Sequence, residues 1–397
     1  MTDIAPEFNT HPMELNIGPS HPAMHGTIRI KVELDGETII KSNTEVGFLH
    51  RAFEKECESV RWAQCLPYTD RLNYVSPLIN NFGFTAAVEK LLNIEIPIRA
   101  QYIRVIASEL SRISDHLTCL AAMSMELGGF TAYLYFIEGR EYIYDLIEEL
   151  TGARVTVNYA RIGGVALDLP VDFDKHIQVA FKKVFKLIDD SDKLLTHNRI
   201  FIDRTAGVGQ ISSADAIAFG ITGPFLRATG FAHDLRKVHP YYVYNNFEFD
   251  IPIGSQGDVY DRFLVRLEEL RQSRKIINQA LTQIPNGDYI LNEHYCVLPT
   301  KDRVYTTIEG LMHHFKVIID GAQVPAGEVY SYSEGANGEL GFYLVSDGSG
   351  YPYKCRLRSP CFVIMAALDE VLLKNANLAD VVPIFGSINM IGGECDR

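Results

Sequence analysis

The sequence contains no C-x-x-C pair and no excess of basic residues. Its seven cysteines are scattered and odd in number, so a disulfide framework is not expected. The formal net charge is −13, which argues against the basic patch that a nucleic-acid partner requires. The charge balance by itself leaves the chemistry of the chain undecided.

The opening residues MTDIAPEFNT have neither a basic region nor an apolar core, so no export signal is expected. One apolar stretch, from Leu117 to Ile137, carries a single formal charge at Glu126 and is interrupted by Gly128-Gly129. A membrane-spanning helix needs about 20 continuous apolar residues, and a glycine pair is a better helix stop. We therefore predict two buried helices that meet at a glycine corner, in a soluble protein that can sit on a membrane complex.

The two ends of the chain have the pattern of β-sheet. With 397 residues, 47% of them hydrophobic, the chain can bury a large core. Residues 27–34 alternate apolar and polar like a half-buried strand, Asp35-Gly36 predicts a tight turn, and a return strand follows over residues 38–40. Short β-like runs, GELGFYLVSDG and YKCRLRS, return after Gly321.

Five helices are expected between these ends. The clearest follows Pro97, because six apolar residues recur at alternating spacings of three and four and form one stripe. Four charged residues of this segment lie off the stripe: Arg104, Glu109, Arg112 and Asp115. The other helices are expected over about 131–151, from Asp172 or Asp174, over about 258–283 and over about 303–319.

These patterns divide the chain into three regions: β-rich residues 1–96, a central helical bundle over 97–320, and a β-containing region over 321–397. No internal repeat or low-complexity linker separates them. We therefore expect one intertwined α+β unit, with antiparallel sheet flanking the bundle at both ends.

The most unusual segment is GPSHPAMHG, residues 18–26, in which His21 and His25 are four residues apart. On a helix this spacing would suggest paired metal ligands. Two prolines and two glycines argue against a helix, and no third ligand is nearby in sequence. Two interpretations remain: a rigid loop whose histidines cap backbone groups, or a stiff loop that presents His25 to a cavity.

Two further segments combine charges with aromatic residues. GFLHRAFEK, residues 47–55, is typical of the solvated face of a helix start. PYTDRLNYVSP, residues 67–77, offers an aspartate, an arginine and two tyrosines. A buried ion pair with core tyrosines is the simplest interpretation of the second segment.

Taken in this order, GPSHPAMHG, GFLHRAFEK, PYTDRLNYVSP and AVEKLL closely resemble the D subunit of proton-pumping NADH:quinone oxidoreductase, bacterial respiratory complex I. The likeness spans nearly the whole chain from about Met13. It continues through IRVIASELSRISDHL, GREYIYDLIEELTG, RIGGV, GDVYDRFLVRLEELRQS, GELGFYLVSDG and the terminal Asp396-Arg397. The resemblance implies a core subunit that forms the quinone headgroup site and binds no redox cofactor of its own.

That family is similar in fold to the large subunit of NiFe hydrogenases, which hold their metals between two C-x-x-C pairs of soft thiolates. Here Cys57 and Cys65 are eight residues apart, and Cys355 and Cys361 are six apart, so hydrogenase activity is not expected. The resemblance implies that the vacated cavity binds quinone. Two alternatives stay open: a hydrogenase-like subunit with its own metal, and a non-catalytic scaffold that has lost the cavity.

Carried over residue by residue, His25 and Tyr74 match the pair that hydrogen-bonds the quinone carbonyls in the family. Reduction builds negative charge on both oxygens; histidine, with a pKa of about 6.5, and the tyrosine hydroxyl can both donate there. Glu126 aligns with a position that more often carries an aspartate paired with the histidine, although it could instead cap the next helix. Arg51 matches the arginine that approaches the terminal iron–sulfur cluster of a neighbouring subunit, and Ala52 stands where the family often has glycine.

Thr156 stands where many members carry a histidine near that cluster. Without this titratable neighbour, we expect a weakly pH-dependent cluster potential, which would fit a low-potential acceptor such as menaquinone. The implied partners are the cluster-bearing B subunit, the C and I subunits, and the H subunit in the membrane. The implied location is peripheral, on the cytoplasmic side of the inner (plasma) membrane.

Overall fold

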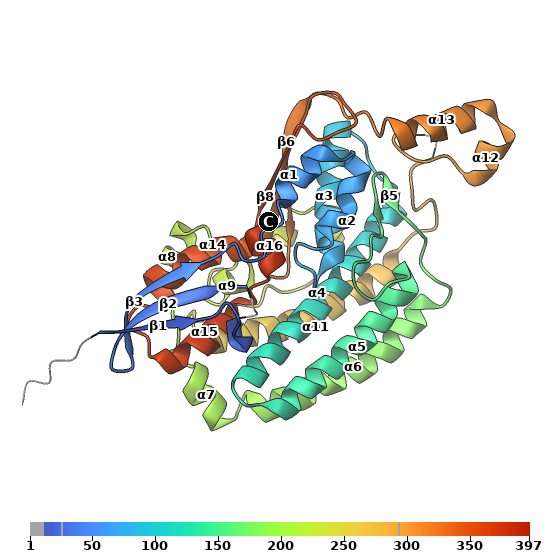
Figure 1. Ribbon diagram of the computed structural model, residues 1–397. Helices are drawn as coiled ribbons and strands as arrows, with labels where there is room; N and C mark the ends of the chain where they lie inside the picture. The colour runs from blue at the N-terminus through green and yellow to red at the C-terminus, as the bar shows by residue number, and fades with distance from the viewer. Residues whose placement is uncertain (1–11, 25–26, 293) are drawn as a thin grey trace, which may run out of the picture.

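The computed structural model describes residues 12–24, 27–292 and 294–397. A three-stranded antiparallel sheet lies near each end of the sequence, and long helices fill the space between them (Figure 1). The expected α+β class is therefore confirmed. In the described part of the chain, no helix is both long and apolar enough to cross a membrane.

The N-terminal sheet consists of β1 (Met13–Ile17), β2 (Arg29–Asp35) and β3 (Thr38–Glu45), in that order. The β2–β3 hairpin matches the sequence prediction, although β3 is longer than the predicted strand. Alternate residues of β2 point into the core, as their near-complete burial shows. Strand β1 was not predicted; it pairs antiparallel with β2, from Met13 opposite Leu34 to Ile17 opposite Ile30.

The C-terminal sheet consists of β6 (Gly327–Glu334), β7 (Glu339–Ser346) and β8 (Lys354–Arg358). The last two strands match the predicted β-like runs, and β6 completes the sheet. Helix α3 (Pro77–Leu92) packs across β6 and β7. Phe84 of α3 meets Phe342 of β7 edge to face, with ring centroids 5.6 Å apart.

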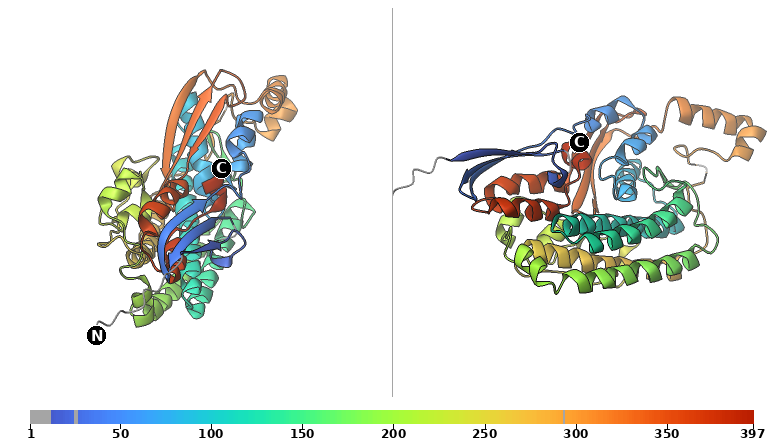
Figure 2. Two further views of the ribbon diagram at one scale, coloured as in Figure 1. Left: turned by 60° about the vertical axis from the view of Figure 1, so that its left-hand side comes forward. Right: turned by 60° about the horizontal axis from the view of Figure 1, so that its bottom comes forward.

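The bundle contains α4 (Ile98–Glu126), α5 (Phe130–Thr151), α6 (Phe173–Leu195) and α11 (Val259–Gln283), which lie side by side (Figure 2). All four helices match predicted segments. The glycine corner between α4 and α5 is present, because Gly128 adopts a left-handed φ of +84°. Helix α11 is capped by the Asp258 side chain, which accepts a hydrogen bond from the Asp261 N–H.

Helix α4 is buried on almost every side. It packs against α3, α5, α11 and α15 (Val381–Ile388). The predicted apolar stripe faces the core, but the charged residues off the stripe are also fully buried: Arg104, Glu109, Arg112 and Asp115. The amphipathic pattern therefore marks only one of the buried faces of this helix.

The prediction of one helix over about 303–319 is wrong, because the segment forms two. Helix α12 (Lys301–Thr306) ends at Thr307, whose backbone is extended, and α13 (Ile308–Ile319) follows at once. The Thr307 hydroxyl accepts a hydrogen bond from the Gly310 N–H and so begins the second helix. The two helices project from the body of the molecule (Figure 1).

Short elements complete the fold. Those that position the candidate site are η1 (Pro22–Met24), α1 (Phe53–Ser59), α2 (Leu66–Thr69), α14 (Pro360–Ala367) and α16 (Gly392–Asp396). The others are η2 (Trp62–Cys65), β4 (Ala160–Arg161), β5 (Gly164–Val165), α7 (Arg199–Thr205), α8 (Ser213–Ala218), α9 (Gly223–Arg227), α10 (Leu235–Val238), η3 (Tyr244–Asn246), the π-helix η4 (Leu368–Leu372) and η5 (Leu378–Asp380).

Candidate functional site

The glycine pair that opens α16 brings two distant segments together. A Cβ on Gly392 would lie 2.9 Å from the Thr27 side chain. A Cβ on Gly393 would overlap the Arg71 carbonyl oxygen and lie 2.8 Å from the Leu72 carbonyl oxygen. Neither glycine has a positive φ, so the close approach itself excludes a side chain here. His25 lies outside the described residues, but Thr27 follows it by two positions and Leu72 precedes Tyr74 by two.

Tyr74 is a partly exposed tyrosine whose phenol has a raised pKa. Its side chain is 45% exposed, in the segment that links α2 to α3. Burial of the remainder, together with the nearby charge of Asp115 and the Cys361 thiol, raises the pKa of Tyr74. The phenol therefore keeps its proton at neutral pH and can donate it to a more basic oxygen.

Asp115 is a buried, hydrogen-bonded carboxylate near Tyr74. It is fully buried on α4, and two side-chain amides hold it. Asn73 Nδ2 donates to one carboxylate oxygen at 2.7 Å, and Asn389 Nδ2 donates to the other at 2.6 Å. The two amides satisfy the hydrogen-bonding capacity of the buried carboxylate. Because they are neutral, they do not cancel its charge, which still acts on neighbouring groups.

Glu126 lies at the end of α4, in the wall of a mostly apolar cavity of about 490 Å³. The cavity is also lined by η1 and by residues of α5 and α15: His21, Pro22, Ala23, Tyr133, Ile137, Arg140 and Val382. The Glu126 carboxylate rests against Gly386, where any Cβ would overlap it. The structure thus brings Glu126 beside the loop that precedes His25, while the pairing of Glu126 with His25 lies outside the described residues. His21 itself has a local role, since its Nδ1 accepts from the Ala23 N–H at 3.2 Å.

Arg51 lies on the other side of the glycine pair. Its Nη2 donates to the carbonyl oxygens of Arg71 at 2.6 Å and Gly393 at 3.3 Å. Partial burial and the nearby Arg71 guanidinium lower the pKa of Arg51. In the described part of the chain neither arginine forms an ion pair, so two cations are available at this surface.

Ala52, next to Arg51, adopts the left-handed conformation, with φ 55° and ψ 36°. Glycine is favoured there, and an L-residue costs about 1 kcal/mol. Ala52 therefore holds a glycine-like backbone conformation at a small cost in stability.

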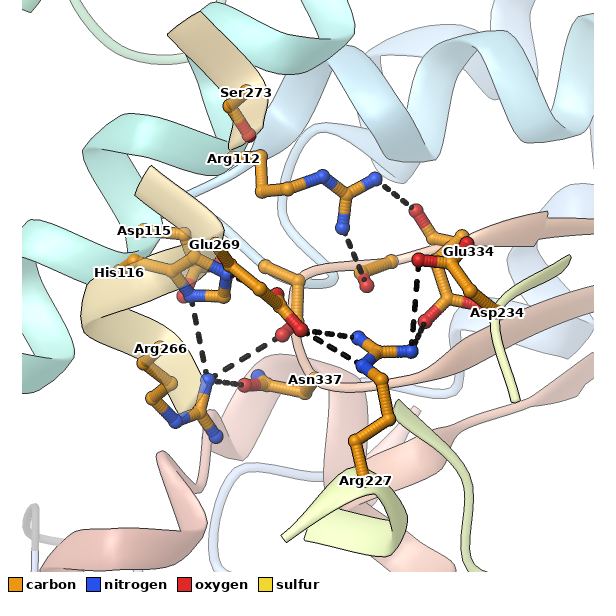
Figure 3. Close-up of polar contacts among 12 residues, drawn as sticks. Arg112, Asp115, His116, Arg227, Asp234, Arg266, Glu269, Ser273, Glu334 and Asn337 are labelled. Atoms are coloured by element: carbon orange, nitrogen blue, oxygen red, sulfur yellow. Dashed lines mark hydrogen bonds and ion pairs between the residues drawn. The ribbon is translucent and has the colours of Figure 1, made fainter. Parts of the chain in front are cut away.

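Buried charged side chains of α4, α9, α11 and β6 form an ionic network (Figure 3). His116 Nε2 and Glu269 Oε2 are 2.7 Å apart, Arg227 contacts Glu269 at 2.6 Å, and Arg227 also contacts Glu334 at 2.8 Å. Arg112 donates to the backbone carbonyl of Glu334 at 2.6 Å. Although burial opposes it, Arg227 and His116 hold the pKa of Glu269 well below its usual range. The network ties α4 to α9, α11 and β6.

Two asparagines, Asn337 and Asn389, connect the network to Asp115. Arg266 Nη1 donates to Asn337 Oδ1 at 3.2 Å, and Asn389 Nδ2 donates to the same oxygen at 2.8 Å. Asn389 is also a donor to Asp115. Sequence reasoning missed the network, because its partners come from distant segments and their spacing within each helix has no distinctive period.

The four cysteines Cys57, Cys65, Cys355 and Cys361 do not gather into one four-thiolate metal site. Cys65 Sγ approaches the Cys57 carbonyl oxygen at 3.5 Å, and contact with Cys57, together with burial, raises the pKa of the Cys355 thiol. Cys361 lies apart from these three, next to Asn337 and Asn389. Among the residues that the structure describes, no group of three or more His, Cys, Asp or Glu side chains could hold a metal ion.

Comparisons with known proteins identify the family of this chain. The family model for the respiratory-chain NADH dehydrogenase 49 Kd subunit matches residues 126–397. The NADH-quinone oxidoreductase D subunit of Myxococcus xanthus is 54% identical over 396 residues, covering 100% of this chain and 95% of that protein. The D 1 subunit of Sorangium cellulosum is 55% identical over 392 residues, covering 98% and 97%. The chain belongs to this family.

The expected resemblance to the D subunit of complex I is confirmed, and the chain is a subunit of an oxidoreductase complex of the respiratory chain. A further relative, the NADH-quinone oxidoreductase C/D subunit of Bdellovibrio bacteriovorus, is 51% identical over 390 residues, which are 98% of this chain and 70% of that protein. The name of that relative assigns the C and the D subunit to one chain.

Thr156 is exposed and has a left-handed φ of 56°. Two residues later, the Asn158 N–H donates to Asp70 Oδ2 at 3.1 Å. Burial raises the pKa of Asp70 to about 6. A titratable carboxyl is therefore hydrogen-bonded to the backbone two residues beyond Thr156, and no pattern in the sequence indicated it.

Proposed function

We propose that this chain forms the quinone headgroup site of a proton-translocating NADH:quinone oxidoreductase, with His25 and Tyr74 as the two hydrogen-bond donors. The observation that carries the proposal is the junction at Gly392 and Gly393. The segments that follow His25 and precede Tyr74 both pack against it, and Tyr74 itself is partly exposed and within reach of the Asp115 charge.

The chemistry of the site fits quinone reduction. Two electrons convert each carbonyl oxygen into an oxyanion that needs a donor and then a proton. A phenol that stays protonated at neutral pH supplies one donor, and the proposed imidazole of His25 supplies the other. Glu126, in the wall of the apolar cavity, would favour the charged imidazole and fix its orientation.

Arg51 and Arg71 support the position of the electron donor. Two exposed cations that form no close ion pair in the described residues suit an anionic iron–sulfur cluster held by a neighbouring subunit. A fixed cation near a cluster favours its reduced form. We propose the B subunit as that neighbour, and the C, I and H subunits as the other partners of a peripheral subunit on the cytoplasmic side of the membrane.

Exposed apolar residues on α12 and α13 support a role in a larger assembly. Tyr305 is 84% exposed, Ile308 77% and Phe315 56%. Side chains of this kind gathered on two projecting helices are typical of surfaces that a partner covers. The fold that we propose for the chain is that of a NiFe-hydrogenase large subunit whose metal pocket has become the quinone cavity.

The test is Tyr74→Phe in the assembled complex. Loss of one donor to a developing oxyanion costs roughly 10²-fold in rate, so NADH:quinone activity should fall by about that factor. Electron transfer from NADH to ferricyanide, which does not use the quinone site, should stay unchanged. Tyr68→Phe is the matched control, because it removes a neighbouring hydroxyl for which the described residues offer no hydrogen-bond partner.

Full quinone activity in Tyr74→Phe would exclude the proposed site. Photolabelling of the wild-type complex with a quinone analogue should mark this chain, whereas an inert scaffold would not be labelled. Nickel or an iron–sulfur centre ligated by this chain, found by metal analysis of the intact complex, would favour the hydrogenase-like alternative.

A further inference from the structure

A cavity of about 430 Å³ runs along α3, on the face of the helix that packs against α4 and β6 (Figure 1). Tyr74 does not line this cavity. Its polar end is marked by Lys90, which lies in the last turn of α3, whereas Tyr74 precedes the first residue, Pro77. At about 1.5 Å per residue, Lys90 is about 20 Å from the start of the helix. The cavity is therefore separate from the proposed quinone site.

The contacts between α3 and β6 place a cation beside two serines. A Cβ on Gly83 would lie 2.9 Å from Ser333 Oγ, so this serine faces the helix. The Lys90 ammonium lies 5.3 Å from the centroid of the Tyr332 ring. Tyr332 stands between Ser331 and Ser333 in β6, so the ammonium lies close to the strand segment that carries both hydroxyl groups.

Three serine hydroxyls in the cavity wall lack hydrogen-bond partners in the described residues. Ser108, Ser331 and Ser333 all line the cavity, and none of them is more than 6% exposed. Ser333 Oγ is completely buried and still unpartnered. Buried hydroxyl groups normally have a partner, because leaving one without a hydrogen bond costs free energy. Unpartnered hydroxyls around a cavity of this size indicate a ligand that supplies the missing hydrogen bonds.

Lys90 gives the cavity a positive charge that no carboxylate neutralises. It forms no ion pair in the described structure; burial lowers its pKa, and no neighbouring carboxylate raises it. Two carboxylates also line the cavity. Glu89 is held by two nitrogens of Arg104 at 2.6 and 2.8 Å, and Glu95 is exposed to solvent, which screens its charge. The cavity therefore favours a ligand with a single negative charge.

The remaining walls are mostly apolar and aromatic, and include Ile79, Phe82, Ala86, Ile96, Tyr241 and Tyr332. A ring or a short alkyl chain can pack against such walls while a few polar groups fix its orientation. A carboxylate matches the one unpaired charge of Lys90, whereas a phosphate dianion would keep one charge without a partner.

We propose that this cavity binds a small organic monocarboxylate. Its carboxylate group pairs with the Lys90 ammonium and accepts a hydrogen bond from the Ser331 hydroxyl, and its apolar body packs against Phe82 and Tyr241. This site does not depend on the proposed quinone function, because the two share no residue.

The test is equilibrium dialysis of the assembled complex against radiolabelled phenylacetate and hexanoate, which carry the carboxylate on an aromatic and an alkyl body. We expect saturable binding to a single site with a Kd of about 1 mM or lower, as is usual for ligands of this size. Phenylacetamide has the shape of phenylacetate without the charge and should not displace it. Inorganic phosphate should compete only weakly. Absence of saturable binding for both carboxylates, or displacement by the amide as effective as by unlabelled phenylacetate, would overturn the proposal.

Two variants locate the binding. Lys90→Met removes the charge, keeps most of the side-chain volume and should raise the Kd by at least about tenfold. Ser331→Ala should raise it by about two- to tenfold. It should not lower the thermal unfolding midpoint of the ligand-free protein, because the hydroxyl has no partner there to lose. Lys182→Met is the matched control and should keep the wild-type Kd, since Lys182 is an exposed residue of α6 that does not line the cavity.

Wild-type affinity in both Lys90→Met and Ser331→Ala would place the binding elsewhere and overturn the proposal. If Lys90→Met fails to assemble, Ser331→Ala decides alone. Binding by the purified full chain but not by the assembled complex would also overturn it, and would assign the cavity to a carboxylate of a neighbouring subunit. These measurements do not use quinone activity, so failure of this proposal is distinguishable from failure of the proposed quinone site.

Discussion

Substitution of Gly393 by alanine should displace the segment that carries Tyr74, part of the proposed quinone site. The new Cβ would overlap the Arg71 carbonyl oxygen and lie 2.8 Å from the Leu72 carbonyl oxygen, where ordinary contact begins at 3.4 Å. The Leu72 backbone must therefore retreat by about 0.6 Å, and Tyr74 moves with it. Misplacement of a reacting group by about 1 Å can cost 10²-fold in rate. We expect a 10–100-fold loss of quinone activity and about 1–3 kcal/mol of stability from overpacking.

The assay is NADH:quinone activity of the assembled Gly393→Ala complex, normalised to its rate with ferricyanide. Gly327→Ala is the matched control, because the nearest atom to its new Cβ is a Leu91 methyl carbon at 3.9 Å and its φ is not positive. The control should keep wild-type activity. Quinone activity in Gly393→Ala within twofold of wild type would refute the packing argument.

Three further predictions concern the ionic network and the cluster. Glu269→Gln leaves Arg227 partly uncompensated and should lower stability by about 3–5 kcal/mol. Because the pKa of Glu269 is depressed on folding, thermal unfolding should show this difference undiminished above pH about 5 and shrinking as the pH falls; a constant difference would contradict the ion pair. Arg51→Met should lower the cluster potential by roughly 40 mV, or about 1 kcal/mol of lost attraction, in a redox titration followed by EPR; an unchanged potential would place the cluster elsewhere. Since Thr156 cannot titrate and Asp70 has a pKa of about 6, the potential should be nearly constant above pH 7, and a fall of a full proton's worth per pH unit there would contradict this.

The sequence predicted the long helices well, because their stops are local. Gly152 ends α5 with a left-handed φ, and Asp258 caps α11 through its own side chain. The break at Thr307 was missed, because the sequence does not distinguish a threonine that caps a helix from a threonine inside a helix. Strand β1 was missed because its short segment gains order from pairing with β2, a contact between distant residues.

The candidate site was predicted from resemblance and not from pattern. Tyr74 and Glu126 show no periodicity that separates them from core residues, and their surroundings come from elements far away in sequence. The buried charges of α4 illustrate the reason. Arg112 and Asp115 would be solvated on an isolated helix, but β6 and the Asn389 segment satisfy them. Such compensation becomes visible only once the whole chain has folded.

The anchoring of residues 47–50 by Asp396 has a consequence for synthesis. Asp396 Oδ1 accepts from the Gly47 N–H at 2.9 Å, Oδ2 accepts from the Leu49 N–H at 2.7 Å, and 349 residues separate the first pair. At about 5–20 residues per second, a ribosome needs roughly 20–70 s to make the intervening chain. Throughout that interval the loop before Arg51 lacks its hydrogen bonds to Asp396, so this surface takes its final form only after Asp396 has been made.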